Sequence, residues 1–229
     1  MTAAAQQRKT ALLLFARTPD EESRIKNFTH AGEGLNRRVA ATLHAETLRL
    51  ARRTGLPIYH ISEREQVGET FGERYRNAFE RLYARGYTHV LSIGSDCVGL
   101  TASDLRTAVA TLEHTGRVIG PTPAGGAYVV GVERSRFRSA EFTALPWQTN
   151  YLLTALSAHL TCAPADYLPL RHDANGAAEL HLALRGLSSL SSWRRVLRFV
   201  LAGPKVTPIS TNFFPTNPAA RLLPPTRAP

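Results

Sequence analysis

Two aspartates that each follow a predicted strand are the strongest candidates for chemistry in this chain. Asp96 comes after the apolar run Val90-Leu91-Ser92-Ile93 and the turn Gly94-Ser95, and Asp173 follows a second run at residues 167–170. Ligands of open α/β sheets sit beyond the carboxyl ends of the strands, so a carboxylate there is well placed to hold a metal ion or a phosphate-bearing ligand. Alternatively, Asp96 only closes an Asx turn before the next helix. The recurrence of an aspartate in this setting favours the site hypothesis for both.

Cationic side chains cluster in the loop that is predicted after the first strand. This strand covers residues 10–17, and the polar segment 19–28 follows it. Arg17, Arg24 and Lys26 would place positive charge near the carboxyl end of that strand, which suits a phosphate group. A solvated loop without a ligand is the alternative, because short motifs of this kind have little specificity.

Further segments contain residue types that suit ligand contact. A glycine-punctuated stretch leads into a helix and contains Glu73 and Arg74, which either border a ligand or form a surface pair at the helix start. Gly125-Gly126 lies between two predicted strands, where paired glycines allow a backbone to approach a ligand or simply form a turn. Trp147 either offers a flat face to a ring-shaped ligand or packs in the core.

The predicted elements that position these residues alternate between strand and helix. Strands are expected at 10–17, 56–62 and 88–93, with helices at 33–54, from about 74 to 85, and at 101–114. This β-α-β-α-β-α order implies a parallel sheet with right-handed crossovers. Two strands at 118–121 and 127–132, joined by a tight turn, break the alternation and predict a mixed sheet. Helices ending at Leu160 and covering 177–184 complete the domain.

Composition favours one α/β domain with an extension. At 229 residues and 43% hydrophobic content, the chain can bury a full core. No apolar run is long enough for a transmembrane helix, and the first residues lack the pattern of a signal peptide, so we expect a cytoplasmic protein. The two cysteines, Cys97 and Cys162, are too few for a disulfide framework or a thiolate metal site.

The net charge of +10 arises mainly near the C-terminus, where seven basic residues and no acidic residue follow Glu179. We therefore assign residues 10–186 to one α/β domain and 187–229 to a basic helix and a proline-rich tail. The helix at 188–202 is expected to pack on its own domain, with a weak peripheral membrane contact as the alternative. Nucleic-acid binding through the tail is not expected, because no base-reading or stacking motif accompanies the charge.

Several motifs in the correct order resemble one protein family. The most specific is Gly94-Ser95-Asp96-Cys97 with Gly99-Leu100, and it is supported by Phe71-Gly72-Glu73-Arg74, Gly120-Pro121, Gly125-Gly126 and Pro146-Trp147. From about Ala11 to Leu184 the chain resembles the glycosyltransferase-A (GT-A) fold of nucleotide-diphospho-sugar transferases. Within that fold it resembles a bacterial branch known as domain of unknown function 2064, some of whose members are described as arsenosugar-biosynthesis glycosyltransferases.

The resemblance implies a Rossmann-like three-layer sandwich with a mixed, mostly parallel sheet, and it implies roles for the candidate residues. Asp96 and Asp173 correspond to aspartates that share a metal ion, expected to be Mg²⁺ or Mn²⁺, which would neutralise charge on a leaving nucleoside diphosphate. The remaining residues fall into two groups: a nucleotide or phosphate group of Arg17, Lys26, Glu73, Arg74 and Ser95, and a substrate group of Gly125, Gly126 and Trp147.

Three departures from the family pattern concern charged residues. The usual arginine at the end of the first loop is Phe28, the usual aspartate before the paired glycines is Ala124, and the second aspartate of the later motif is Asn175. Each change removes a group that could bind phosphate, substrate or metal. The leading hypothesis is therefore a glycosyltransferase, with altered or reduced activity, that uses a small or lipid-like acceptor. The alternatives are a degenerate nucleotide-binding or scaffold protein and a nucleotidyltransferase related to phospholactate guanylyltransferases.

Overall fold

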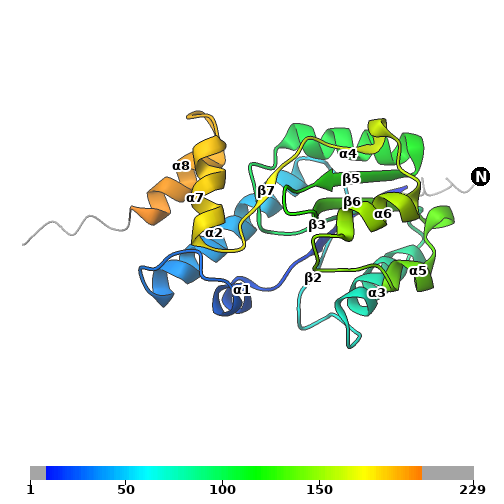
Figure 1. Cartoon of the computed structure of the whole chain (residues 1–229), viewed down its shortest axis with the longest axis horizontal. Coiled ribbons are helices and arrows are strands. Elements are labelled where there is room, and N and C mark those ends of the chain that lie inside the picture. The colour runs from blue at the N-terminus through cyan, green and yellow to red at the C-terminus, as the bar shows by residue number, and fades with distance from the viewer. Residues whose placement is uncertain (1–8, 203–229) are drawn as a thin grey trace, which may run out of the picture.

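Five strands form one mixed sheet at the centre of the molecule (Figure 1). The computed structural model describes residues 9–202. The strand order is β2-β1-β3-β6-β5, and β1 is parallel to both of its neighbours, whereas β6 is antiparallel to β3 and β5. The strands are β1 (Thr10–Phe15), β2 (Ile58–Ile61), β3 (His89–Ile93), β5 (Arg117–Pro121) and β6 (Ala127–Glu133). Only β6 runs against the others, which confirms the predicted mixed, mostly parallel sheet.

Helices cover both faces of this sheet and produce the three layers (Figure 1). One face packs against α2 (Glu33–Arg52) and α4 (Ala102–Thr115), and the same apolar cluster continues beyond the sheet, where α8 (Ser192–Leu201) packs on α2 and α7 (Ala177–Gly186) lies next to β7. The other face packs against α3 (Phe71–Ala84), α5 (Ser139–Thr143) and α6 (Leu152–Leu160). Because β3 lies between two strands and two helical layers, all five of its residues are buried. The carboxyl end of β3 is therefore a fixed reference point for the site.

Capping interactions fix where the helices next to the site begin. The Thr70 side chain accepts from the backbone N–H of Glu73, and the Glu73 carboxylate accepts from the N–H of Thr70. Thr101 and Asp104 form the same reciprocal arrangement at the start of α4. Each capping box satisfies two N–H groups that a helix end would otherwise leave unpaired. These boxes define the first turns of α3 and α4.

The segment after β1 corrects one sequence prediction. Residues 19–28 were expected to form a polar loop, but α1 (Pro19–Ile25) occupies most of this segment. Its signals are local: the Thr18 side chain caps the helix, Pro19 stands at its first turn, and acidic residues follow. The short length and the high polarity of the segment concealed a helix that positions Lys26.

The approach to Asp173 corrects a second prediction. Residues 167–170 were expected to form the last strand, but they form only one bridge, between Tyr167 and Ile119. Pro169 has no N–H to donate to a ladder, which limits pairing there. The regular strands in this region are instead the short β4 (Cys97–Val98) and β7 (His172–Asp173), which pair with each other outside the main sheet.

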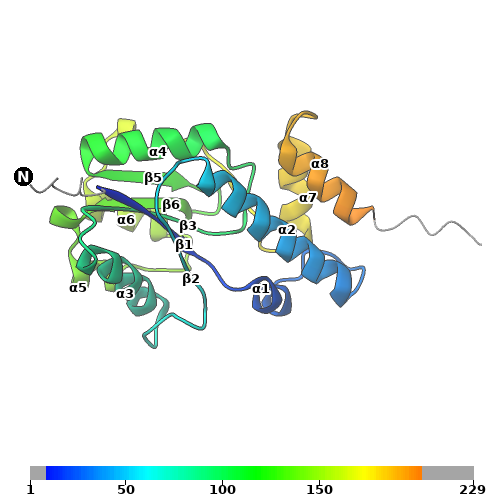
Figure 2. The same ribbon diagram turned by 180° about the vertical axis from the view of Figure 1, so that it is seen from behind.

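The C-terminal helix α8 packs on its own domain. Figure 2 shows it beside α2, and Trp193, Leu197 and Val200 are buried in the same core as α2. The Trp193 indole N–H donates to the carbonyl oxygen of Leu100 at 2.8 Å. The predicted tail beyond residue 202 lies outside the described residues. Among residues 9–202, no helix combines the length and the apolar character needed to span a membrane.

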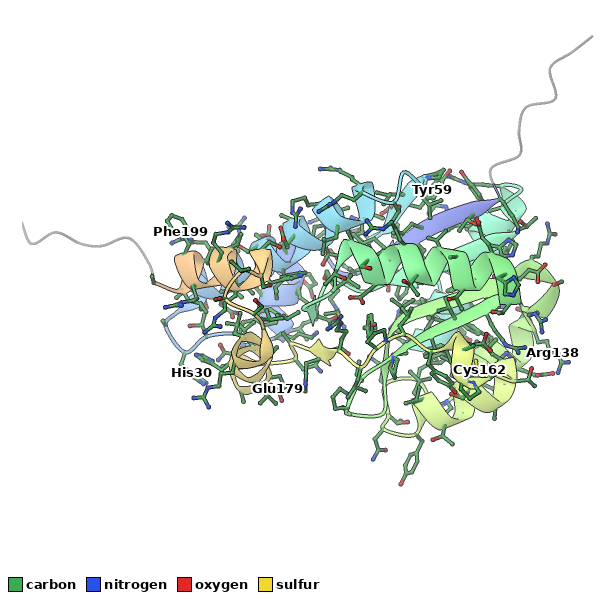
Figure 3. The ribbon with its side chains drawn as sticks, turned by 90° about the horizontal axis from the view of Figure 1, so that it is seen from above. His30, Tyr59, Arg138, Cys162, Glu179 and Phe199 are labelled. Atoms are coloured by element: carbon green, nitrogen blue, oxygen red, sulfur yellow. The ribbon has the colours of Figure 1, made fainter. Side chains whose placement is uncertain are left out.

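Trp193→Ala should destabilise the protein strongly, because it removes a buried ring and leaves the Leu100 carbonyl without its donor. We expect the free energy of unfolding to fall by about 3–5 kcal/mol, measured by urea denaturation. Phe199→Ala on the same helix is the matched control, since Phe199 is 78% exposed and points away from the body of the protein (Figure 3). Its effect should stay within about 0.5 kcal/mol. Equal effects of the two substitutions would contradict the packing of α8.

Candidate active site

A pocket of about 850 Å³ opens at the carboxyl ends of β1 and β3. It receives side chains from the loops after β1, β2 and β3, from the β5–β6 hairpin, from the α5–α6 connection and from β7. This is the position at which α/β sheets bind their ligands. The predicted site residues that line it are Arg17, Lys26, Arg74, Ser95, Asp96, Gly126, Trp147 and Asp173.

The pairing of β4 with β7 brings the two predicted aspartates together. Cys97 lies opposite Asp173 in the register of this small sheet, so Asp96 and Asp173 are next to each other across it. The backbone N–H of Ala174 donates to the carbonyl oxygen of Asp96 at 2.8 Å. Both carboxylates line the pocket. Two acidic groups that are far apart in the sequence therefore converge at one rim of the main sheet.

The segment before Asp173 is anchored at several points, which fixes the position of its carboxylate. The N–H of Leu168 donates to the carbonyl oxygen of Ile119, and the N–H of Arg171 donates to that of Pro121. The Arg171 guanidinium also forms a bidentate pair with Asp104, at 3.0 and 3.2 Å. Asp104 already belongs to the capping box of α4. The residues before β7 are thus tied to β5 and to α4.

The ammonium group of Lys26 binds two carboxylates inside the pocket. Its Nζ lies 2.6 Å from Asp96 Oδ2 and 2.8 Å from Glu22 Oε1. Burial alone would lower the pKa of Lys26, but the attraction of Asp96 and Glu22 outweighs burial and raises this pKa above its usual value. Glu22 also binds Arg17, at 3.0 Å. Arg17 and Lys26 are therefore held by one glutamate, whereas Arg24, the third cation of this segment, is exposed and pairs with Glu21 outside the pocket.

Asp173 has no comparable cationic partner. Burial, followed by the negative charge of Asp96, raises the pKa of its carboxyl group from 3.8 to about 8, although Lys26 opposes the shift. Its Oδ1 is buried and accepts no hydrogen bond from any residue that the structure describes. A buried carboxylate oxygen without a donor is unfavourable unless it binds a proton or a cation. A proton or a cation bound to this oxygen would therefore stabilise Asp173.

Asp96 and Asp173 could hold a hard divalent cation only if other ligands complete its coordination. Among the described residues, no group of three or more His, Cys, Asp or Glu side chains could enclose a metal ion. Mg²⁺ and Mn²⁺ sites of phosphate-processing enzymes do not need such a group, because one or two carboxylates share the ion with substrate phosphates and water. Asp96 and the unpaired oxygen of Asp173 match this smaller ligand set.

Two predicted residues do not line the pocket. The carboxylate of Glu73 is occupied by the N–H groups of Glu69 and Thr70, so its role in the structure is to cap α3. Gly125 has a positive φ of 78° and packs against the carbonyl of Asn150, where a Cβ atom would not fit. It shapes the hairpin while Gly126 faces the pocket. Sequence motifs alone did not separate these roles.

Trp147 combines both of the roles that the sequence left open. Its ring contacts the rings of Phe71, Tyr75 and Phe142, with centroid distances between 4.9 and 5.7 Å. The indole N–H donates to the carbonyl oxygen of Phe142 at 2.8 Å. Because the residue is only partly buried and lines the pocket, the same packing holds one part of the ring against the ligand space.

The three departures from the family pattern occupy different environments. Phe28 is fully buried in the core, and its backbone N–H donates to the Asn36 side chain. The Phe28 side chain therefore packs beside α2 and does not reach the pocket. Ala124 and Asn175, in contrast, both line the pocket and are exposed. Only these two departures change the chemical character of the pocket wall.

Sequence reasoning missed three residues that shape the site. Glu22 stands four residues before Lys26, a spacing that signals an ion pair once the segment is known to be helical. Glu63 accepts from the backbone N–H and the hydroxyl of Thr18, and so fixes the start of α1. Gln148 has a positive φ of 63° at the pocket rim, which no local pattern predicts.

One family of sequences matches more than half of this chain. It is described as "Uncharacterized protein conserved in bacteria (DUF2064)", and it matches residues 29–149. The chain belongs to this family. The match includes Asp96 and Trp147 but ends before Asp173. No curated protein matches this DUF2064 member.

A solved structure shares the fold of this DUF2064 protein. A protein from Desulfovibrio desulfuricans G20, provisionally named a nucleotide-diphospho-sugar transferase, aligns with a TM-score of 0.64 and 22% identity, covering 85% of this chain and 96% of its own. Rv0371c from Mycobacterium tuberculosis H37Rv aligns with a TM-score of 0.49 and 13% identity, covering 81% of this chain and 100% of its own. The first of these similarities shows a common fold.

Asp173→Asn should change how the stability of this DUF2064 protein depends on pH. Because the folded protein holds a proton on Asp173 up to about pH 8, the unfolded chain releases it near pH 4, and wild-type stability falls between these values. Asparagine cannot lose that proton. We therefore expect the free energy of unfolding of the variant, relative to that of wild type, to rise by about 1 kcal/mol or more between pH 5 and pH 9, measured by urea denaturation with a chelator present.

Asp20→Asn is the matched control for this prediction, since Asp20 lies on α1 outside the pocket and pairs with Arg37 on the surface. Its stability difference from wild type should not grow in the same way across the pH range. A flat difference for Asp173→Asn would show that the carboxyl group is ionised in the folded protein at neutral pH.

Proposed function

We propose that this protein is a metal-assisted glycosyltransferase that binds a nucleoside-diphosphate sugar in the pocket described above. The observation that carries the proposal is the convergence of Asp96 and Asp173 beside Arg17 and Lys26, at the carboxyl ends of β1 and β3. This arrangement combines carboxylates for a cation with cations for a diphosphate. The shared fold with the Desulfovibrio desulfuricans protein, together with that protein's name, supports the same class of donor.

The cationic side of the pocket is suited to the diphosphate. Arg17 is 35% exposed and Lys26 is 14% exposed, so both can reach a ligand while Glu22 holds them in place. A phosphate oxygen near Lys26 would share its ammonium group with Asp96 and Glu22, since the ammonium has three donors. Charge-assisted hydrogen bonds of this kind are among the stronger polar contacts in proteins. Lys26 would therefore orient the phosphates next to Asp96.

Asp96 and Asp173 would hold the Mg²⁺ or Mn²⁺ ion. When bound, this ion would supply neutralisation of the charge that develops on the departing nucleoside diphosphate. In the transfer itself, an acceptor hydroxyl oxygen forms a bond to the anomeric carbon while the bond from that carbon to the diphosphate oxygen breaks. The diphosphate leaves with the electron pair, and the hydroxyl proton passes to water or to a carboxylate of the site.

Titration with nucleoside diphosphates tests the binding half of the proposal. Calorimetry with UDP, GDP, ADP, CDP and dTDP should detect at least one complex that requires Mn²⁺. Asp96→Asn and Asp173→Asn should each weaken that complex about tenfold or more, because each removes a negatively charged oxygen ligand. Binding of no diphosphate in a metal-dependent way would refute the proposal.

Lys26→Met should weaken diphosphate binding by about tenfold, the effect of losing one charge-assisted contact. Lys9→Met is the matched control, because Lys9 is exposed and precedes β1, at the end of the strand opposite to the pocket. It should leave the affinity unchanged. A similar loss in both variants would indicate general electrostatic attraction rather than a defined phosphate position.

Turnover then separates the candidate activities. Release of the nucleoside diphosphate from a nucleotide sugar, with glycosylation of an acceptor, would support the glycosyltransferase. Pyrophosphate release from a nucleoside triphosphate with a phosphorylated substrate would instead assign a nucleotidyltransferase. Metal-dependent binding without either reaction would assign a nucleotide-binding protein that has lost catalysis.

A further inference from the structure

The wall of the pocket changes character across the sheet. Its acidic and basic side chains come from the segments after β1, β2 and β3, from α3 and from β7. The β5–β6 hairpin and the α5–α6 connection contribute residues 122, 124, 126, 127 and 147–150, and none of these is charged. We call this second part the uncharged wall. Because β5 and β6 lie on the other side of β3 from β1 and β2, the sheet order separates this wall from the charged residues that follow β1 and β2.

Close backbone contacts hold the uncharged wall in place. Gly125 packs against the carbonyl of Asn150, and its own carbonyl oxygen accepts from the N–H of Leu153 at 2.8 Å. On the other side, Gly72 of α3 packs against Thr143 and the Trp147 ring, with no room for a Cβ atom. The α5–α6 connection is therefore fixed to the hairpin tip and to α3.

The same connection presents polar groups that the fold does not use. Gln148 and Asn150 are exposed, and neither side-chain amide forms a hydrogen bond with another described residue. Gln148 also adopts a left-handed backbone conformation that is unfavourable for a residue with a side chain. Strain of this kind persists where the surroundings over-determine it, and it is concentrated at ligand sites. Two amide side chains without a described hydrogen-bond partner therefore belong to residues that line the pocket.

A wall of uncharged amides and aromatic rings suits an uncharged sugar. An amide can donate to one hydroxyl and accept from another, and a partly exposed aromatic ring covers the apolar face of a sugar. Trp147 supplies such a ring inside the pocket, and Tyr151, at 70% exposed, follows Asn150 in the chain. A charged group placed against this wall would lose water without gaining a counterion there. Arg74, which lines the pocket from α3, donates from one guanidinium nitrogen to the Glu69 carbonyl oxygen at 2.6 Å and is not part of the uncharged wall.

We infer that the uncharged wall binds the acceptor, and that the acceptor is a carbohydrate that carries no charge at the ring it presents. This inference rests on the proposed transferase function and specifies its second substrate. Gln148 and Asn150 bind hydroxyl groups of that ring, and Trp147 packs against its face. Ala124, at the exposed tip of the hairpin, keeps the wall free of a carboxylate.

Saturation-transfer NMR tests this inference with defined probes. The neutral probes are the methyl glycosides of glucose, galactose and mannose, and the charged probes are glucosamine and glucuronate, with diamagnetic Mg²⁺ and the best nucleoside diphosphate present. We expect at least one neutral glycoside to bind at least fivefold more tightly than either charged sugar. Absence of binding by all the neutral glycosides, or tighter binding of a charged sugar, would overturn the inference.

Matched variants distinguish this inference from the proposed function. Asn150→Ala and Gln148→Gly, the latter retaining the left-handed backbone, should each weaken glycoside binding at least threefold and leave diphosphate affinity within twofold. Lys26→Met should instead weaken diphosphate binding and leave glycoside binding unchanged. Ala124→Asp should increase the affinity for glucosamine and decrease that for glucuronate. If glycosides bind normally to both amide variants while diphosphate binding is intact, the inference about the acceptor fails. If the wild-type protein binds no nucleoside diphosphate, the proposed transferase function itself fails.

Discussion

The antiparallel pairing of β4 with β7 is the interaction on which the site depends. It joins the residues after the central strand to a segment that arrives from the far side of β5, and it sets Asp173 beside Asp96. Each strand has only two residues, so the pairing is not stable by itself. Its stability comes from the anchors around it: the N–H of Ala174 on Asp96 and the Arg171–Asp104 ion pair.

Once the two carboxylates are adjacent, their different surroundings give them different chemical states. Asp96 has the Lys26 ammonium at 2.6 Å, whereas Asp173 keeps a buried oxygen without a donor. Burial and the nearby charge of Asp96 raise the pKa of Asp173, because like charges in a shared site disfavour ionisation. Under the proposed function, a bound cation would lower this pKa again, so metal binding would depend on pH. Glu22 extends this balance by holding Lys26 and Arg17 on one side of the pocket.

The amino-acid sequence by itself determined much of the fold, because the relevant signals are local. The alternation of apolar runs with amphipathic helices predicted the sheet and its layers, and the turn at residues 122–126 predicted the change to a mixed sheet. Asp96, Lys26 and Trp147 were identified from residue type and position, and all three line the pocket. The sequence also showed which family residues are replaced at Phe28, Ala124 and Asn175.

Only the tertiary structure decided how these residues combine. The family resemblance implied that Asp96 and Asp173 lie close together, but the β4–β7 pairing that brings them together was not predicted, because neither segment carries a local signature of it. The capping role of Glu73 became evident only when its carboxylate was seen to bind backbone N–H groups. Likewise, the strain at Gln148 and the contact of Gly125 with Asn150 arise from packing between distant segments. Local sequence specifies elements and candidate groups, whereas charge balance, burial and the shape of the wall depend on what the rest of the chain places beside them.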